Sequence, residues 1–250
     1  MSADDIRERI RKTFEKELGA YEKITVLAQD LLDRHRDKFV VVPRRPSTAV
    51  VAALFAKAWK TAHAIYLLAC AGYGQDAVDL ARTLTNLCID LGYICEGDSD
   101  KRARLWSAAG QLERLKIKRD FKGALSKREE ARYSRLKALT KPWTDLKIEG
   151  RARQSGRQSF YTTTFRHGSS YSHSDSWSAA SFLKRNPDAI EALNAPSETD
   201  VGDALFMAVV ALADIVVTCG QFYGMDIRAF DQEMRPVIEK GFDGEEELRQ

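Results

Sequence analysis

The sequence STAVVAALFAKAWKTAHAIYLLACA, residues 47–71, decides the fold class of this chain. Its large apolar side chains follow the spacing of three and four residues that is typical of a helix. They are Val50, Val51, Leu54, Phe55, Trp59, Ile65, Leu67 and Leu68. We expect Ser47 to be the N-cap and Gly72 and Gly74 to end the helix. The segment is therefore predicted to form one long apolar helix.

Helical spacing continues on both sides of this segment. Residues 2–39 carry apolar side chains three and four residues apart, and Pro43 and Pro46 end that pattern because proline lacks an amide donor. Further helices are predicted over residues 75–96, 100–120, 126–141, 158–172 and 200–223. No run alternates convincingly with period two, so no strand is expected.

Local signals set the expected ends of several elements. Pro142 is expected to end the helix that begins near residue 126, and residues 144–157 are then predicted to be a loop. Asp200 is the expected cap of the last apolar helix. Seven of the 13 residues from Ser169 to Ser181 are serine, which predicts a turn there.

The predicted fold class is an all-α bundle of about seven to nine helices, since long helices with short connections form antiparallel neighbours. We expect a single domain over residues 1–250. Within it, residues 1–46 would supply an N-terminal helix and linker, 47–225 the core bundle and 226–250 a C-terminal tail.

Composition excludes several classes of protein. With 44% hydrophobic and 30% charged residues, the chain is neither disordered nor fibrous. Four cysteines are too few for a disulfide scaffold, and no apolar stretch follows the N-terminal charges, so a cytoplasmic protein is expected. Residues 200–223 are the best candidate for a membrane span, but Asp203 and Asp214 interrupt them. We therefore expect a buried core helix and no membrane partner.

Common motifs for metals and cofactors are missing from the sequence. It contains no Cys-x-x-Cys or His-x-x-x-His pair, Walker loop, dinucleotide fingerprint or Gly-x-Ser-x-Gly elbow. The sequence therefore predicts neither a metal site nor a cofactor.

Charge is distributed unevenly along the chain. Residues 101–157 carry a net charge of +12, whereas residues 1–100 carry −1 and residues 158–250 carry −8. Such a basic block is typical of a surface that binds a polyanion. A solvated helical hairpin that faces the acidic C-terminal third explains the same charges equally well.

A polar stripe runs along the predicted helix 75–96. Asp79, Arg82, Asn86 and Asp90 are spaced by three, four and four residues, so they share one face of an otherwise apolar helix. Because unpaired buried charges are costly, the stripe must either form an internal ladder of ion pairs or line a cleft.

A second group of polar residues lies at 166–173, which reads RHGSSYSH. Arg166 and His173 are almost two helical turns apart and would project from roughly the same face. A guanidinium grips a phosphate bidentately, and an imidazole transfers protons near neutral pH. This pair favours phosphate chemistry.

Two stretches, 64–95 and 160–175, resemble a bacterial family known only as a domain of unknown function. That family typically shows an Arg-[Ser/Thr]-Leu-x-Glu core and a later Tyr…Arg…Ser…His segment. The matching positions here are Arg82-Thr83-Leu84-Thr85-Asn86 and Tyr161…Arg166…Ser170…His173. Asn86 stands where the family usually has an acid, so a role that needs a carboxylate there is in doubt.

The segment from Arg166 to His173, with His167 as its polar second residue, is also similar to the signature of the HEPN superfamily. This resemblance implies a helical bundle, a homodimer and a metal-independent ribonuclease of toxin–antitoxin or antiphage systems. It implies that Arg166 and His173 are catalytic, that RNA (tRNA included) is the partner, and that an antitoxin or regulatory protein exists. Some members only bind, so a non-catalytic nucleotide-, RNA- or protein-binding module is the alternative function. A third alternative is that Arg166 and His173 only satisfy each other and the polar stripe inside the bundle.

The basic block would hold RNA through phosphate contacts, which are independent of sequence and sensitive to salt. The expected RNA-binding residues are Lys116, Lys118, Arg119, Lys122, Arg151, Arg153 and Arg157. Tyr161 beside the motif could stack on a base, although a core position suits it better.

Overall fold

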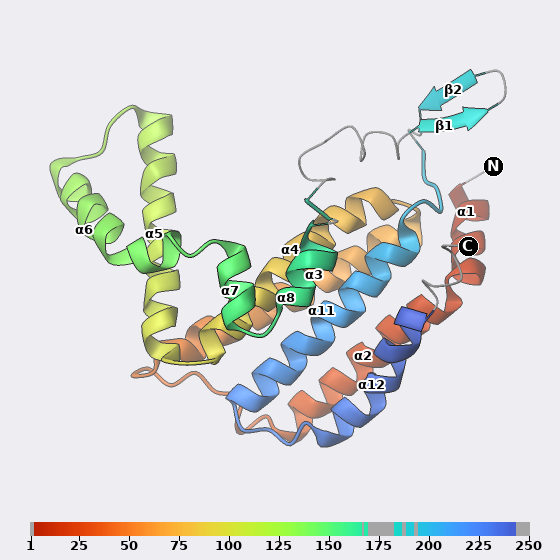
Figure 1. Cartoon of the computed structure of the whole chain (residues 1–250), viewed down its shortest axis with the longest axis horizontal. Coiled ribbons are helices and arrows are strands. Elements are labelled where there is room, and N and C mark those ends of the chain that lie inside the picture. Colours follow the sequence, from red (N-terminus) through yellow and green to blue (C-terminus); the bar gives the residue numbers. More distant parts are fainter. Residues whose placement is uncertain (1–2, 167, 170–182, 187–188, 193–194, 244–250) are drawn as a thin grey trace.

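The computed structural model describes residues 3–166, 168–169, 183–186, 189–192 and 195–243 (Figure 1). Over these ranges it contains ten α-helices, one π-helix and one short β-hairpin, so the all-α bundle is confirmed. The helices are α1 (Ala3–Thr13), α2 (Glu15–Arg34), α3 (Pro46–Ala71), α4 (Gly74–Cys95), α5 (Ser99–Lys122), α6 (Lys127–Thr144), α7 (Ile148–Gln154), α8 (Gln158–Phe160), the π-helix η1 (Tyr161–Phe165), α11 (Val201–Phe222) and α12 (Arg228–Asp243).

The core lies between α3, α4 and α11, and α2 and α12 cover the outer side of α11 (Figure 1). Small residues such as Ala58, Ala62, Ala81 and Ala208 are almost fully buried here, which lets the helices approach closely. Larger side chains such as Leu84 fill the remaining space. The apolar run of residues 47–71 thus forms a central helix of the bundle, as its sequence predicts.

Helix α11 is long and apolar enough to cross a membrane. In this structure it packs against α2, α3 and α4, and two thirds of its most apolar window is buried inside the bundle. The prediction of a buried core helix is therefore confirmed for residues 201–222.

The ends of α3 differ partly from the prediction. Gly72 ends it in the left-handed conformation (φ 85°) that glycine adopts without strain. At the other end, however, Ser47 is not the N-cap, because Arg45 holds that position and Pro46 begins the helix. The Ser47 hydroxyl and amide instead donate to the Asp100 carboxylate (2.6 and 3.1 Å) and lower the pKa of Asp100. The first turn of α5 thereby ties down the start of α3.

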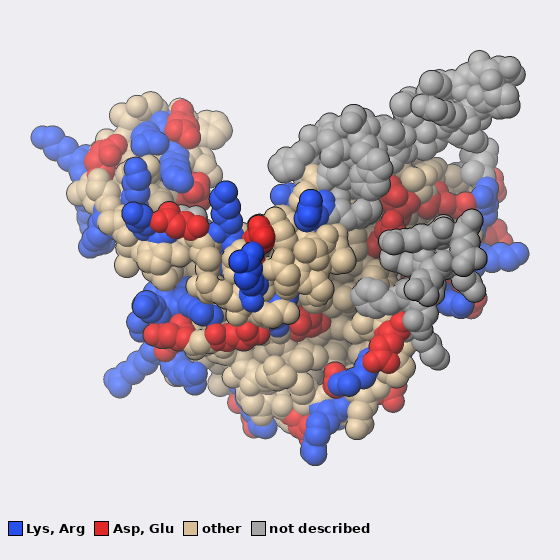
Figure 2. All heavy atoms as spheres, viewed as in Figure 1, with Lys and Arg blue, Asp and Glu red and all other residues tan. Residues whose placement is uncertain are grey.

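The two helices α5 and α6 form an arm that projects from the bundle (Figure 1). The first half of α5 packs on the main core through Ala103, Leu105 and Trp106. The rest of the arm has a small core of its own, made of Ala108, Leu112, Leu115 and Leu136. Lys and Arg side chains dominate the surface of this arm (Figure 2).

Several predicted boundaries are wrong for local reasons. Pro142 does not end α6 but lies within its last turn, where a missing amide costs only one hydrogen bond. The predicted loop 144–157 contains α7, and the predicted C-terminal tail contains α12, whose Phe230 and Met234 are buried. Asp200 is the N-cap residue of α11 as predicted, but it adopts a positive φ of 60° and its side chain makes no cap hydrogen bond.

The remaining differences concern the N-terminal helix and the region after α8. Residues 2–39 form two helices rather than one, because the backbone departs from helical geometry at Phe14 (φ −110°, ψ 31°). The predicted helix 158–172 forms as α8 followed by η1, and the described residues 166, 168 and 169 beyond η1 are helical too. Strands β1 (Leu183–Asn186) and β2 (Ala189–Ala192) pair antiparallel, with residue 183 opposite residue 192. Each strand has only four residues, so its alternation of apolar and polar side chains is too short to be detected in the sequence.

The start of α6 makes the arm sensitive to acid. The Glu129 carboxylate binds the Lys118 ammonium and the amide and hydroxyl of Ser126, and these contacts lower its pKa from 4.5 to about 2. Because the folded pKa is depressed, the stabilisation is complete above pH 4.5 and is lost as the pH falls toward 2. We expect the protection of the amides of residues 127–144, measured as the exchange rate relative to the intrinsic rate at the same pH, to fall over this window in the wild type. Glu129→Gln should show fast exchange already at pH 6, and equal profiles for the two proteins would contradict this role.

Candidate functional site

The segment from Arg157 to Ser169 lies between α4 and a cleft. One side of it packs against α4, and the other side lines the cleft. Three contacts fix it to α4. The Thr85 hydroxyl donates to Thr164 (3.2 Å), and Arg82 donates to the Ser169 hydroxyl (3.0 Å) and stacks over Phe165. Its π-helix η1 is a rare conformation that occurs often at functional sites.

Arg157 begins this segment and is the most heavily bonded arginine of the region. Its guanidinium donates to both carboxylate oxygens of Asp214 (2.8 and 3.3 Å). It also donates to Glu96 (2.8 Å), to the Ser155 carbonyl (2.7 Å) and to the Thr218 hydroxyl (2.7 Å). Only 9% of the side chain is exposed. The network therefore links the segment to α4 and α11 through a buried charge pair.

The electrostatics of this network follow from burial and from the Asp214 carboxylate. Burial acts to lower the pKa of Arg157, but Asp214, Cys88 and Glu96 together outweigh this effect and raise it. Cys88 donates to the same carboxylate (Sγ to Oδ2, 3.1 Å), and burial and the negative charge raise the thiol pKa well above its ordinary value. Gly92 lies directly against the guanidinium, because a Cβ there would be 2.1 Å from Nη1 of Arg157.

Asp90, the last residue of the polar stripe, forms a second buried ion pair. The Arg151 guanidinium donates to it (2.7 Å), donates to the Leu146 carbonyl (2.6 Å) and lies over the Trp143 ring. Burial raises the pKa of Asp90, although Arg151 acts in the opposite direction. This pair holds α7 and the end of α6 against α4.

The stripe residues lie along one face of α4 as predicted, with different exposure. Asp79 is exposed, Arg82 and Asn86 are half-buried, and Asp90 is buried. Because Arg82 and Asp90 bind residues of the segment 146–169, the face serves as the docking surface for that segment.

The structure places only some residues of the motif. Arg166 is exposed, and its side chain forms no hydrogen bond or ion pair with any residue that the structure describes. Tyr161 is half-buried and stacks on Phe165 (5.5 Å between ring centroids). His167, Ser170 and His173 lie outside the described residues.

The predicted RNA-binding residues divide into two groups. The prediction is wrong for Arg151 and Arg157, because both are buried in ion pairs and are not surface cations. Arg153 is exposed and pairs with Glu149. Lys116, Lys118, Arg119 and Lys122 lie on the arm. Sequence reasoning missed Phe121 among them, which is 87% exposed.

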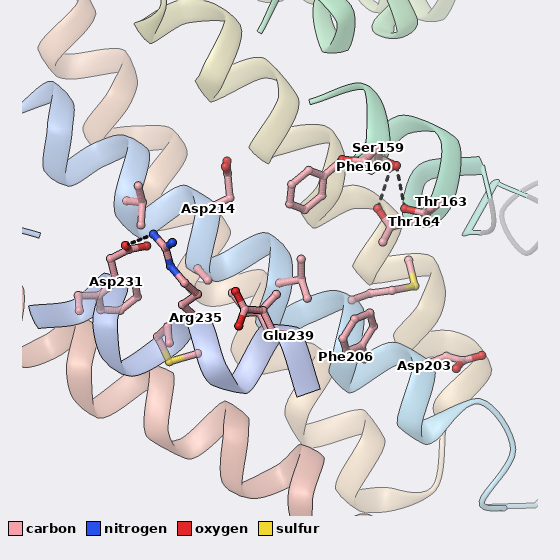
Figure 3. Close-up of a pocket in the computed structure, with 17 residues that line it drawn as sticks. Ser159, Phe160, Thr163, Thr164, Asp203, Phe206, Asp214, Asp231, Arg235 and Glu239 are labelled. Carbon is pink, nitrogen blue, oxygen red and sulfur yellow. Dashed lines mark hydrogen bonds and ion pairs between the residues drawn. The ribbon is translucent and has the colours of Figure 1, made fainter. Parts of the chain in front are cut away.

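A cleft of about 770 Å³ opens between α8, η1, α11 and α12 (Figure 3). Its apolar lining includes Phe160, Phe206 and Met234, and its polar lining includes Asp214 and the ion pair between Asp231 and Arg235 (2.6 Å). This size is typical of small-molecule sites. Sequence reasoning missed the cleft, although one signal was visible: a carboxylate at Asp214 in an apolar helix requires a partner.

Comparison with known proteins identifies only a family. No curated protein and no solved structure matches the chain. A model described as "Family of unknown function (DUF5677)" matches residues 48–190, more than half of the chain. This range runs from α3 into β2 and includes the polar stripe, Arg157 and Arg166. The chain therefore belongs to DUF5677, a family of unknown function.

Proposed function

We propose that the protein is a HEPN-like, metal-independent endoribonuclease that acts as a toxin or antiphage effector. Arg166 would bind the scissile phosphate and His173 would transfer the proton. The observation that carries this proposal is the state of Arg166, which is exposed and unpaired among the described residues. The other arginines of the region, Arg82, Arg151 and Arg157, bind protein groups.

The backbone on both sides of Arg166 is anchored. Phe165 lies under the Arg82 guanidinium, 5.0 Å from its ring centroid. Gly168 is buried so closely against α4 that a Cβ there would be 2.6 Å from Cβ of Arg82. The backbone position of Arg166 is therefore fixed, and its exposed guanidinium is available to bind an anion.

The reaction needs no group beyond RNA and protein side chains. The 2′-hydroxyl attacks the adjacent phosphorus and gives its proton to His173 acting as base. The bond from phosphorus to the 5′-oxygen breaks, and that oxygen takes the proton from the His173 imidazolium, which restores the neutral base. The products are a 2′,3′-cyclic phosphate and a 5′-hydroxyl. Arg166 would stabilise the charge that develops on the phosphoryl oxygens.

The arm supports binding of an RNA backbone. Basic side chains are more frequent on it than acidic ones (Figure 2), and Phe121, near the end of α5, is 87% exposed. Cations that contact phosphates, combined with an aromatic ring available for base stacking, are typical of surfaces that bind single-stranded RNA.

The test is incubation of the wild type, Arg166→Ala and His173→Ala with total RNA and tRNA in excess EDTA, followed by mapping of the product ends. We expect the wild type to leave cyclic phosphate ends and His173→Ala to be slower by about 10²–10⁴-fold, the usual contribution of a general base. His63→Ala, at an exposed histidine of α3, is the matched control and should cleave normally. Equal cleavage by His173→Ala, or intact RNA with the wild type, would refute the proposal.

A non-catalytic RNA-binding module is the second candidate, and Asn86 favours it because the family usually has an acid there. It predicts intact RNA in all samples together with salt-dependent binding that Arg166→Ala weakens. Filter binding at two salt concentrations distinguishes the two functions.

A further inference from the structure

The cleft between η1, α11 and α12 has no part in the proposed RNA chemistry, yet it has the properties of a ligand site. Its volume of about 770 Å³ is enclosed by walls from three separate parts of the chain (Figure 3). Nine of its 17 lining residues are apolar, as in most small-molecule sites. Three of these nine are phenylalanines and two are methionines. Methionine side chains are flexible, so they adapt to ligands of irregular shape.

The charged groups of the lining are mostly negative. It carries four carboxylates, on Asp203, Asp214, Asp231 and Glu239. Arg157 pairs with Asp214 and Arg235 pairs with Asp231, so the excess negative charge comes from Asp203 and Glu239. Both Asp231 and, more weakly, Glu239 raise the pKa of Arg235. The Glu239 side chain is exposed and forms no hydrogen bond or ion pair with a described residue. A concave surface with an excess of one charge concentrates ligands of the opposite charge.

We propose that this cleft binds a small organic cation, an amine carried on an apolar or aromatic body. Phe160 from α8 and Phe206 from α11 line the cleft from different elements (Figure 3). Aromatic faces attract cations, and the effect is larger where water is excluded. The apolar lining receives the body of the ligand, and Glu239 at the rim faces its ammonium group. The proposal does not depend on RNA cleavage.

The test compares two probes of the same shape and opposite charge. Isothermal titration calorimetry of the full-length protein with tryptamine, a cation, and with indole-3-acetate, an anion, shows which charge of ligand the cleft prefers. We expect tryptamine to bind with a Kd of about 1 mM or tighter and indole-3-acetate to bind at least about tenfold more weakly. Equal affinity of the two probes, or no saturable binding of tryptamine, would overturn the proposal.

Two variants locate the site. Glu239→Gln should weaken tryptamine about three- to tenfold, which is the range for one rim charge. Glu233→Gln on the same helix is its matched control and should bind normally, because Glu233 pairs with Lys23 and does not line the cleft. Val210→Trp fills the cleft and should abolish binding in a protein whose circular dichroism is unchanged. Unaltered binding in both Glu239→Gln and a folded Val210→Trp would show that the probe binds elsewhere.

Discussion

Asp214→Ala should destabilise the protein by about 3–5 kcal/mol, the usual cost of removing one partner from a buried ion pair. The variant leaves the Arg157 guanidinium, 9% exposed, without the carboxylate that accepts two of its hydrogen bonds. Cys88 and Thr218 lose the same acceptor. Since whole domains are stable by only about 5–15 kcal/mol, this loss would remove a large fraction of the free energy of unfolding.

Urea denaturation monitored by circular dichroism measures this cost, and Asp231→Ala is its matched control. Asp231 and Arg235 form an ion pair at 2.6 Å, but their side chains are 42% and 64% exposed. Exposed pairs contribute about 0–1 kcal/mol, so the control should lose no more than that. Equal losses in the two variants would mean that the network around Arg157 has no special role in stability.

Gly92→Ala should destabilise the protein by about 2–4 kcal/mol, through overpacking and broken hydrogen bonds. The new methyl group would lie 2.1 Å from Nη1 and 2.2 Å from Cζ of Arg157, so the guanidinium would have to leave its position. It would then lose its contacts with Asp214, Thr218 and the Ser155 carbonyl together. The direction of the change in stability is informative, because alanine in place of glycine inside a helix normally stabilises a protein by about 1 kcal/mol.

Gly19→Ala in α2 and Gly110→Ala in α5 are the matched controls for this substitution. A Cβ at either position would meet no atom within 4 Å, so both variants should be slightly more stable than the wild type. Thermal unfolding of the three variants side by side measures the contrast. A Gly92→Ala protein as stable as the controls would contradict the close packing of Arg157 on α4.

Sequence periodicity was sufficient for the fold class because the apolar residues of α3, α4 and α11 repeat over more than five turns each. The boundaries were less predictable, since they depend on contacts between distant residues. Ser47 looks like an N-cap in the sequence, but its hydroxyl donates a hydrogen bond to Asp100, which lies 53 residues later. No local pattern contains that information.

The candidate site shows the same limit more clearly. Arg153 and Arg157 are equivalent in the sequence, both arginines of one basic stretch. In the structure Arg153 is exposed, whereas Arg157 is buried against Asp214, 57 residues away. The polar stripe of α4 was predictable because helical spacing is local, but its partner Arg151 was not.

The π-helix η1 also has a mechanical consequence for the residue that follows it. A π turn contains roughly one residue more than an α turn. Conversion of η1 to α geometry would therefore advance every later residue by one position, a rotation of about 100° and a translation of about 1.5 Å. Arg166 is the first residue after η1, so it would swing to a different side of the segment. The chain thus contains a register step of one residue, and removing a single residue from 161–165 would let this turn become α-helical while Arg166 keeps its present position.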